Sequence, residues 1–136
     1  MTDALHAAHF FCAAYMTGII WFVQLVHYPM LHLAVGENPQ AGHREYTRRM
    51  GFVVMPVMLA EVALQGIWLA GTPSTLSWAG AGLLFIVWAS TFFLQVPCHQ
   101  KLEKTFDISV QKKLVQTNWI RTVAWTSRAI LVGWWF

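Results

Sequence analysis

Two ionisable residues lie in the middle of long apolar stretches. Glu61 follows Met50 by 11 residues, and Arg128 follows Asn118 by 10. At about 1.5 Å per residue both lie roughly 15 Å along their helices, so they share a depth. A charged group at the centre of a bilayer is costly and normally faces a partner inside the bundle. We therefore expect Glu61 and Arg128 to pair with each other, and Trp125 to pack beside them. The pair either fixes helix register or forms part of a ligand or proton site.

The segment that carries Arg128 presents a polar face. Asn118, Arg121, Trp125 and Arg128 are spaced by three, four and three residues, which places them on one side of a helix. Two arginines on one buried face would bind a carboxylate-bearing ligand such as a porphyrin, or polarise a quinone carbonyl. The alternative for Arg121 is that its side chain extends to lipid headgroups.

Histidines gather toward one end of the apolar stretches. His27 and His99 fall at similar positions in two of them, so we expect both to line an inner polar cavity with Glu61, Arg121 and Arg128. Imidazole binds metal ions and haem iron, which makes His27 and His99 the candidate metal ligands. No spacing matches a motif such as H-E-x-x-H. Interfacial histidines that are merely hydrated are the alternative.

Four apolar stretches must position these residues. They cover residues 8–31, 50–70, 76–97 and 118–136, and each is long enough for a helix to cross a hydrocarbon core of about 30 Å. The sequence predicts an all-α fold, a four-helix transmembrane bundle that forms a single transmembrane domain over residues 1–136. Asn38-Pro39 is typical of a helix start, and Asp107 or Ser109 would begin the last helix. Pro56 should kink the second helix.

The distribution of Lys and Arg predicts the orientation. Outside the apolar stretches, seven lie in the first and third links and none in the amino terminus or the second link. By the positive-inside rule, those two short loops face the cytoplasm and both termini lie outside. The aromatic belt expected at the outer interface consists of Trp68, Trp78, Trp134 and Trp135. Residues 1–9 carry no Lys or Arg, so we expect no cleaved signal peptide.

Composition agrees with a membrane protein. Only 11% of residues are charged and 57% are hydrophobic, whereas soluble domains carry about a quarter charged residues. A net charge of +3 without a basic stripe argues against a nucleic-acid partner.

Cys12 and Cys98 fall toward opposite leaflets, so we expect free thiols. A faint repeat relates Phe22–His27 to Phe93–His99, although chance explains it equally well.

Several motifs carry a family resemblance. The first pattern is His9, Gly18 and Tyr28-Pro29 in the first stretch, and the second is residues 48–50, 55–58 and 66–68 around the second stretch. These two patterns resemble the HemJ-type protoporphyrinogen oxidases, which are small bacterial four-helix membrane proteins. The resemblance implies that His9 matches the family's haem-associated histidine and that the chain lies in a bacterial inner (cytoplasmic) membrane. The family's lysine on the third helix has no counterpart in residues 76–97. The second half looks more like small bacterial membrane proteins of unknown function, and anthrone-oxygenase-like proteins share the general layout.

Two function classes remain open. The first is a redox or cofactor-binding membrane protein, with a haem, a metal ion or a quinone at His27, His99, Glu61, Arg121 and Arg128, or a haem at His9. The second is a non-catalytic accessory subunit of a larger membrane complex, whose polar core only sets register. Membrane lipids are the expected partners in both, together with a larger complex or further copies of the chain. A transporter is a more distant candidate.

Overall fold

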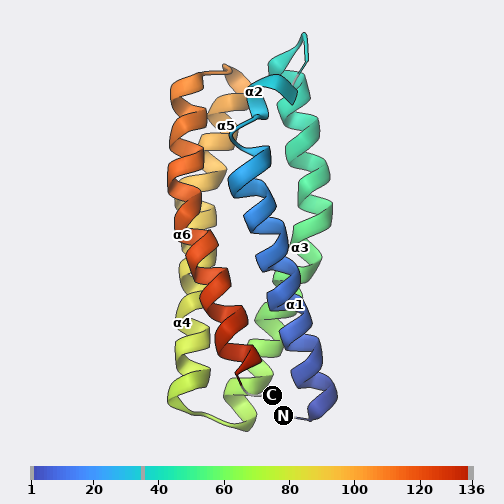
Figure 1. Cartoon of the computed structure of the whole chain (residues 1–136), viewed down its shortest axis with the longest axis vertical. Coiled ribbons are helices and arrows are strands. Elements are labelled where there is room, and N and C mark those ends of the chain that lie inside the picture. Colours follow the sequence, from blue (N-terminus) through green and yellow to red (C-terminus); the bar gives the residue numbers. More distant parts are fainter. Residues whose placement is uncertain (1, 35, 135–136) are drawn as a thin grey trace.

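The computed structural model describes residues 2–34 and 36–134, and every regular element among them is helical. Helix α1 (Asp3–Phe22) continues into a π-helical turn, η1 (Val23–His27), which is followed by the short α2 (Leu31–Ala34). Helix α3 (Pro39–Gly71) is unbroken. Helix α4 (Thr75–Ser90) continues through a second π turn, η2 (Thr91–Gln95), into α5 (Val96–Lys104), and α6 (Ile108–Gly133) is the last helix of the described residues. The long helical segments lie side by side as an elongated bundle (Figure 1), which confirms the all-α prediction.

Three helical stretches are long and apolar enough to cross a membrane. They are Asp3–His27, Pro39–Gly71 and Thr75–Lys104. The first ends four residues before the predicted 8–31, because Pro29 has no N–H to continue the helical hydrogen bonds. The helix α6 covers most of the fourth predicted stretch. Residues 135–136, and with them Trp135 of the predicted belt, lie outside the described residues.

The helix starts follow local side-chain chemistry. Asn38 accepts a hydrogen bond from the backbone of Ala41 at 3.1 Å, with Pro39 in the first turn. Of the two residues predicted to begin the last helix, Asp107 is the cap, since its carboxylate accepts the Ser109 N–H at 2.7 Å. Hydrogen bonding from Ser109 to the ionised carboxylate also holds the pKa of Asp107 below its usual value. Pro56 lies inside α3 without ending it.

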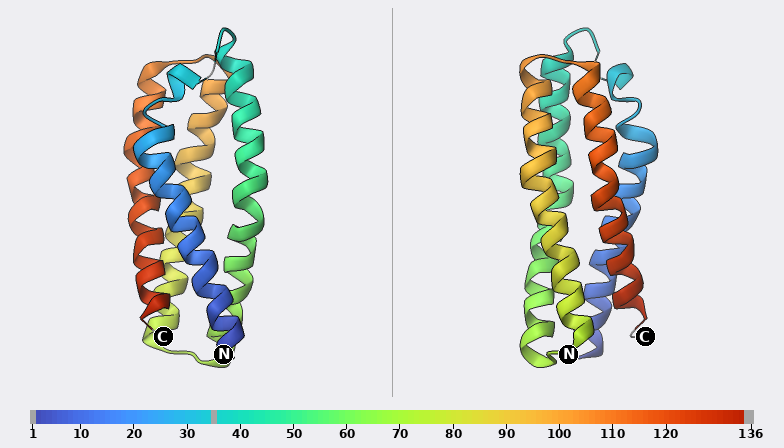
Figure 2. Two further views of the ribbon diagram at one scale, coloured as in Figure 1. Left: turned by 45° about the vertical axis from the view of Figure 1, so that its right-hand side comes forward. Right: turned by 90° about the vertical axis from the view of Figure 1, so that its left-hand side faces the viewer.

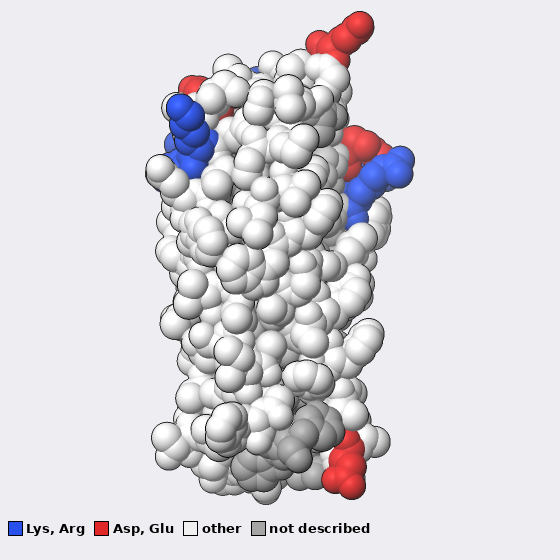
Figure 3. Space-filling model, in the orientation of Figure 1, with Lys and Arg blue, Asp and Glu red and all other residues white. Residues whose placement is uncertain are grey.

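The two ends of the bundle differ in charge. Helix α1 begins and helix α6 ends at the same end of the bundle, beside the turn between α3 and α4, which we call the terminal end (Figures 1 and 2). At the opposite end, α2 lies near the start of α3 and the link from α5 to α6. Lys and Arg gather there, and the middle of the visible face is bare of charge (Figure 3). We call this the basic end.

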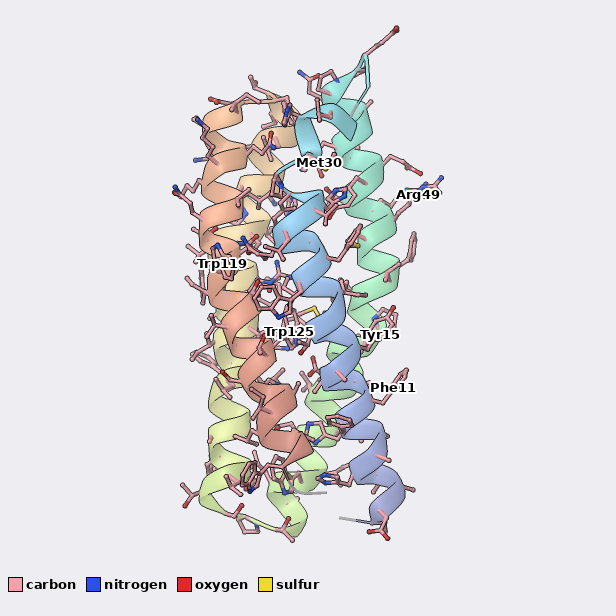
Figure 4. The ribbon with its side chains drawn as sticks, viewed as in Figure 1. Phe11, Tyr15, Met30, Arg49, Trp119 and Trp125 are labelled. Atoms are coloured by element: carbon pink, nitrogen blue, oxygen red, sulfur yellow. The ribbon has the colours of Figure 1, made fainter. Side chains whose placement is uncertain are left out.

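Packing leaves an apolar outer surface and a mixed interior. Phe52, Phe85 and Phe93 are each more than 70% exposed, whereas Trp125 is completely buried. Figure 4 shows Phe11 and Arg49 extending away from the bundle. Trp68 of the predicted outer belt does not face outward from the bundle, because this side chain is 2% exposed. It turns inward against the ring of a histidine on α1, as described below. Trp78 and Trp134 are exposed.

Candidate functional site

The buried arginine of α6 is the centre of a network that joins four helices. Arg128 Nε lies 3.4 Å from Glu61 Oε1 on α3. Its Nη1 donates to Gln65 Oε1 at 3.0 Å and to the Gly80 carbonyl of α4 at 2.6 Å. Its Nη2 lies 3.1 Å from His9 Nε2 on α1. The cation therefore meets one carboxylate and three further acceptors, which satisfies most of its donors without a ligand.

The carboxylate of this network has a second donor. Trp125 Nε1 donates to Glu61 Oε2 at 2.9 Å. Glu61, Trp125 and Arg128 are each 0% exposed. This confirms the prediction that Glu61 and Arg128 face each other across α3 and α6 with Trp125 alongside. The close approach of α4 depends on a residue without a side chain, since a Cβ on Gly80 would lie 2.9 Å from Gln65 Oε1.

The haem that the HemJ-type resemblance implies at His9 does not fit these surroundings. His9 is 0% exposed, and its Nε2 is engaged by Arg128. The Trp68 ring meets it edge-on at a centroid distance of 5.6 Å. Its Nδ1 has no hydrogen-bond partner but is enclosed within the bundle. A haem iron needs an imidazole nitrogen that faces open space, so the packing would have to change first.

A second polar cluster lines a cavity nearer the basic end. The cavity has a volume of about 220 Å³, is partly open, and lies among α1, α3, the α4–η2–α5 segment and α6. Most of its wall is aliphatic or methionine, including Met16, Met50, Met55 and Met58. The polar side chains that line it are Tyr28, Tyr46, Thr47, Thr91, Gln95, His99 and Arg121.

Arg121 and Gln95 in this wall have unused hydrogen-bonding atoms. Arg121 is 8% exposed, forms no ion pair with a described residue, and has no partner for its Nε. Its guanidinium lies over the Trp125 ring, 5.2 Å from the centroid, and near the Tyr28 hydroxyl. Gln95 donates to Thr117 at 2.9 Å, but its Oε1 has no partner. Each unpaired buried polar atom costs about 1–3 kcal/mol, so two residues that line the cavity, Arg121 and Gln95, each have one unmet hydrogen-bonding atom.

A chain of three aromatic groups starts at the same cavity. The Tyr28 hydroxyl lies 3.0 Å from His99 Nε2. His99 Nδ1 lies 3.0 Å from His43 Nε2, and the two rings stack with centroids 5.1 Å apart. His43 is 0% exposed and its Nδ1 has no partner. A neutral imidazole carries one N–H, so the chain can run in either of two directions. Either Tyr28 donates to His99 and His99 to His43, or each bond is reversed.

The structure divides the six predicted site residues between different places. His9, Glu61 and Arg128 belong to the satisfied network, whereas His99 and Arg121 belong to the cavity. His27 lies behind the cavity wall, where its ring stacks on Tyr46 at a centroid distance of 4.0 Å.

The predicted metal ligands are thus not partners of each other. His99 bonds to His43 instead of His27, and both of its ring nitrogens are engaged, so a metal there would have to displace a hydrogen bond. Within residues 2–34 and 36–134, no group of three or more His, Cys, Asp or Glu is arranged to hold a metal ion.

Sequence reasoning missed His43 as part of the site. It lies on the same helical stripe as Glu61, five turns away, and it is too far from Glu61 to share a ligand with it. The spacing of His43 relative to Tyr46 and Met50, rather than to Glu61, could have identified it. His43 is followed three residues later by Tyr46 and seven later by Met50, both of which line the cavity. This spacing marks the face of α3 that meets α5.

The glutamines of the faint repeat both lie in π turns. Gln24 is in η1 and Gln95 in η2. Gln24 is fully engaged, since its Oε1 accepts from Asn118 at 2.9 Å and its Nε2 donates to the Val115 carbonyl at 3.1 Å. Gln95 is the one that borders the cavity. Single π turns inside helices are frequent at functional sites, and here η2 contributes an unpaired acceptor.

Comparison with protein-family models, with curated proteins and with solved structures found no match. The geometry of the two clusters therefore carries the functional argument.

Proposed function

We propose that the chain is an integral protein of the bacterial inner membrane with four spans, both termini outside and the basic end in the cytoplasm. Three stretches that can cross a membrane support this. The helix α6 would be the fourth span, because Asn118, Arg121 and Arg128 are buried while Val123 and Ile130 are 60% and 64% exposed. The Lys and Arg at the basic end support the orientation, and the HemJ-type resemblance supports the membrane.

Within that frame, the protein binds a small lipophilic molecule in the cavity, with an oxygen of its head group at Arg121. The observation that carries this is the unpaired Nε of Arg121 in a wall that is otherwise mostly apolar. Buried arginines normally have partners. Arg128 has four, whereas Arg121 forms no ion pair with a described residue, stacks on Trp125 and lies near the Tyr28 hydroxyl. A carbonyl or an oxygen anion would complete it.

A quinone-type head group suits the cavity better than a haem. At about 220 Å³ the space is smaller than the roughly 300–1,000 Å³ of sites that enclose a drug-sized ligand. A single ring would fill it, and because the cavity is partly open, an isoprenoid or alkyl tail would extend between helices into lipid. A bound quinone would supply reversible electron transfer. Arg121 would orient its carbonyl, and Gln95 would accept from its hydroxyl in the reduced form.

A titration with decylubiquinone tests this function. The purified protein in mild detergent is titrated while tryptophan fluorescence is followed, and lipophiles that co-purify are extracted and identified by mass spectrometry. We expect saturable quenching. Arg121→Met should weaken binding by about 10- to 100-fold, which corresponds to the loss of one hydrogen bond to a charged group.

Matched variants separate the cavity from the fold. A Cβ on Gly51, which lines the cavity, would meet no atom within 4 Å, so Gly51→Leu should fill the space and block binding. Gly66 on the same helix is exposed and equally open, so Gly66→Leu is its control. Arg44→Met is the control for charge, because Arg44 is exposed at the basic end. Equal affinities in all four variants would refute a site at Arg121.

The accessory-subunit alternative would give another outcome. The protein would bind no lipophile and would co-purify in fixed ratio with a larger membrane assembly. The exposed rings of Phe52, Phe85 and Phe93 suit contact with lipid and with partner helices equally.

A further inference from the structure

We infer that the cavity takes a weakly acidic hydroxyl ligand, a quinol or another lipophilic phenol, and holds it as an oxyanion. Arg121 would stabilise the charged oxygen, and the Tyr28–His99–His43 chain would receive the proton. This inference rests on the proposed function, because it specifies the chemical form in which the cavity binds its ligand.

The first step is the charge of Arg121. The acid closest to the middle of the bundle, Glu61, already binds Arg128 and Trp125. The described lining of the cavity contains no carboxylate. A buried guanidinium without a counter-charge keeps its desolvation cost. It therefore gains more from an anion than from a neutral carbonyl, since an anion adds a Coulombic attraction that a neutral carbonyl lacks.

The second step is the acceptor at Gln95. Its Nε2 is used by Thr117, whose hydroxyl in turn donates to the Lys113 carbonyl at 2.8 Å, so the free atom is the oxygen Oε1. That oxygen requires a donor on the ligand. A fatty acid arrives ionised, offers no O–H and needs no proton acceptor. A quinol offers two hydroxyl groups, one to ionise at Arg121 and one to donate to Gln95.

The third step is the destination of the proton. The titratable or charged groups around the cavity are Tyr28 after η1, Tyr46 on α3, His99 on α5 and Arg121 on α6, with His43 and His27 behind them. Of these, only Tyr28 and His99 both line the cavity and are hydrogen-bonded to a further imidazole in the described structure. The α4–η2 segment contributes the neutral Thr91 and Gln95.

The transfer balances without an oxidant. The ligand O–H bond breaks and its proton goes to the Tyr28 oxygen, while the Tyr28 proton passes to His99 Nε2. The proton on His99 Nδ1 then moves to His43 Nε2, 3.0 Å away. The result is a ligand oxyanion and one positive charge on the histidine pair. No electron moves, and the net charge of the site is unchanged.

A lipophilic nitrophenol tests this form of binding. A nitrophenol with a decyl chain is used because its phenolate absorbs at a longer wavelength than the phenol. We expect the pH midpoint of ionisation to lie at least one unit lower on the protein than in empty micelles. Arg121→Met should abolish that shift, while Arg121→Lys should keep part of it. Arg44→Met should behave as the wild type.

A second measurement follows the proton itself. In weakly buffered solution at neutral pH, phenolate formation on the wild type should release far less than one proton per phenolate, because the histidine pair keeps it. His43→Gln and His99→Gln should release close to one. Thermal unfolding identifies the folded variants, and either histidine variant suffices.

The outcomes separate the two proposals. Binding of the probe with an unshifted or raised midpoint would overturn the oxyanion inference and leave the proposed function standing. Release of one proton per phenolate by the wild type would overturn the role of the histidine pair. Failure of both decylubiquinone and the nitrophenol to bind would refute the proposed function, and the inference with it.

Discussion

The buried pair Glu61–Arg128 allows a prediction in which the two partners are unequal. In Glu61→Gln, Arg128 keeps its contacts with Gln65 Oε1, the Gly80 carbonyl and His9 Nε2. In Arg128→Met, Glu61 keeps only the Trp125 N–H. The second change also removes the donor from the acceptors on Gln65, Gly80 and His9. Loss of the arginine should therefore cost more than loss of the carboxylate charge.

The magnitudes follow from the contacts that remain. Removing one partner of a buried ion pair typically costs about 3–5 kcal/mol. We expect Arg128→Met to lie in that range. Glu61→Gln should cost about 2 kcal/mol, because three acceptors remain and Gln keeps the shape of the side chain. The double variant should be more stable than Arg128→Met alone, which requires a coupling free energy of about 2–3 kcal/mol, above the cost of Glu61→Gln and within the range for residues in contact.

Unfolding of the purified protein in detergent measures these differences. Titration with SDS, followed by circular dichroism, gives the free energy of unfolding for the wild type, both single variants and the double variant. Glu45→Gln is the matched control. Glu45 binds Arg48 and Arg49 at the exposed basic end, where solvent screens the interaction, so no measurable change is expected. The reasoning fails if the two single effects add to within about 0.5 kcal/mol, or if Glu61→Gln is the more damaging change.

Three further predictions concern topology, packing and thiols. A reporter fused to the carboxyl terminus should be active outside the cytoplasm and one inserted in residues 101–113 inside it, and the reverse pattern would refute the orientation. Gly80→Ala should destabilise the bundle by about 1–3 kcal/mol, because its Cβ would lie 2.9 Å from Gln65 Oε1, whereas the open site at Gly82 should tolerate Ala; equal unfolding midpoints would contradict this. Cys12 and Cys98 are free, so two maleimides should add to the denatured chain without reductant, and a mass that shows none would contradict the structure.

The sequence predicted the features that depend on local chemistry or on a large energetic penalty. Asn38 and Asp107 begin their helices as predicted, because a capping side chain acts within a few residues. The contact of Glu61 with Arg128 was predictable from depth alone. Two charges at mid-bilayer have few alternatives to each other, so counting residues from the ends of their segments was sufficient.

Features that depend on helix rotation could not be predicted in the same way. Residue counting gives a position along a helix but not the direction a side chain faces in an almost uniformly apolar segment. The inward direction of the Trp68 side chain was therefore not predicted, and His27 was paired with His99 in place of His43. The contact from Arg128 to the Gly80 carbonyl was also invisible, since a backbone acceptor leaves no trace in residue type beyond the small glycine that permits the approach.

The two arginines of α6 show why burial of a charge alone does not identify a binding site. Arg128 and Arg121 are two turns apart on one face, and Trp125 between them contacts both clusters, donating to Glu61 and stacking under Arg121. Arg128 is enclosed by four acceptors and borders no described cavity, so its charge is used to hold helices together. Arg121 is also buried, at 8% exposed, but it lines the cavity and its Nε is unpaired. The two arginines differ in how many hydrogen-bond partners they have, and this difference, not their depth in the bundle, makes Arg121 the candidate ligand-binding residue.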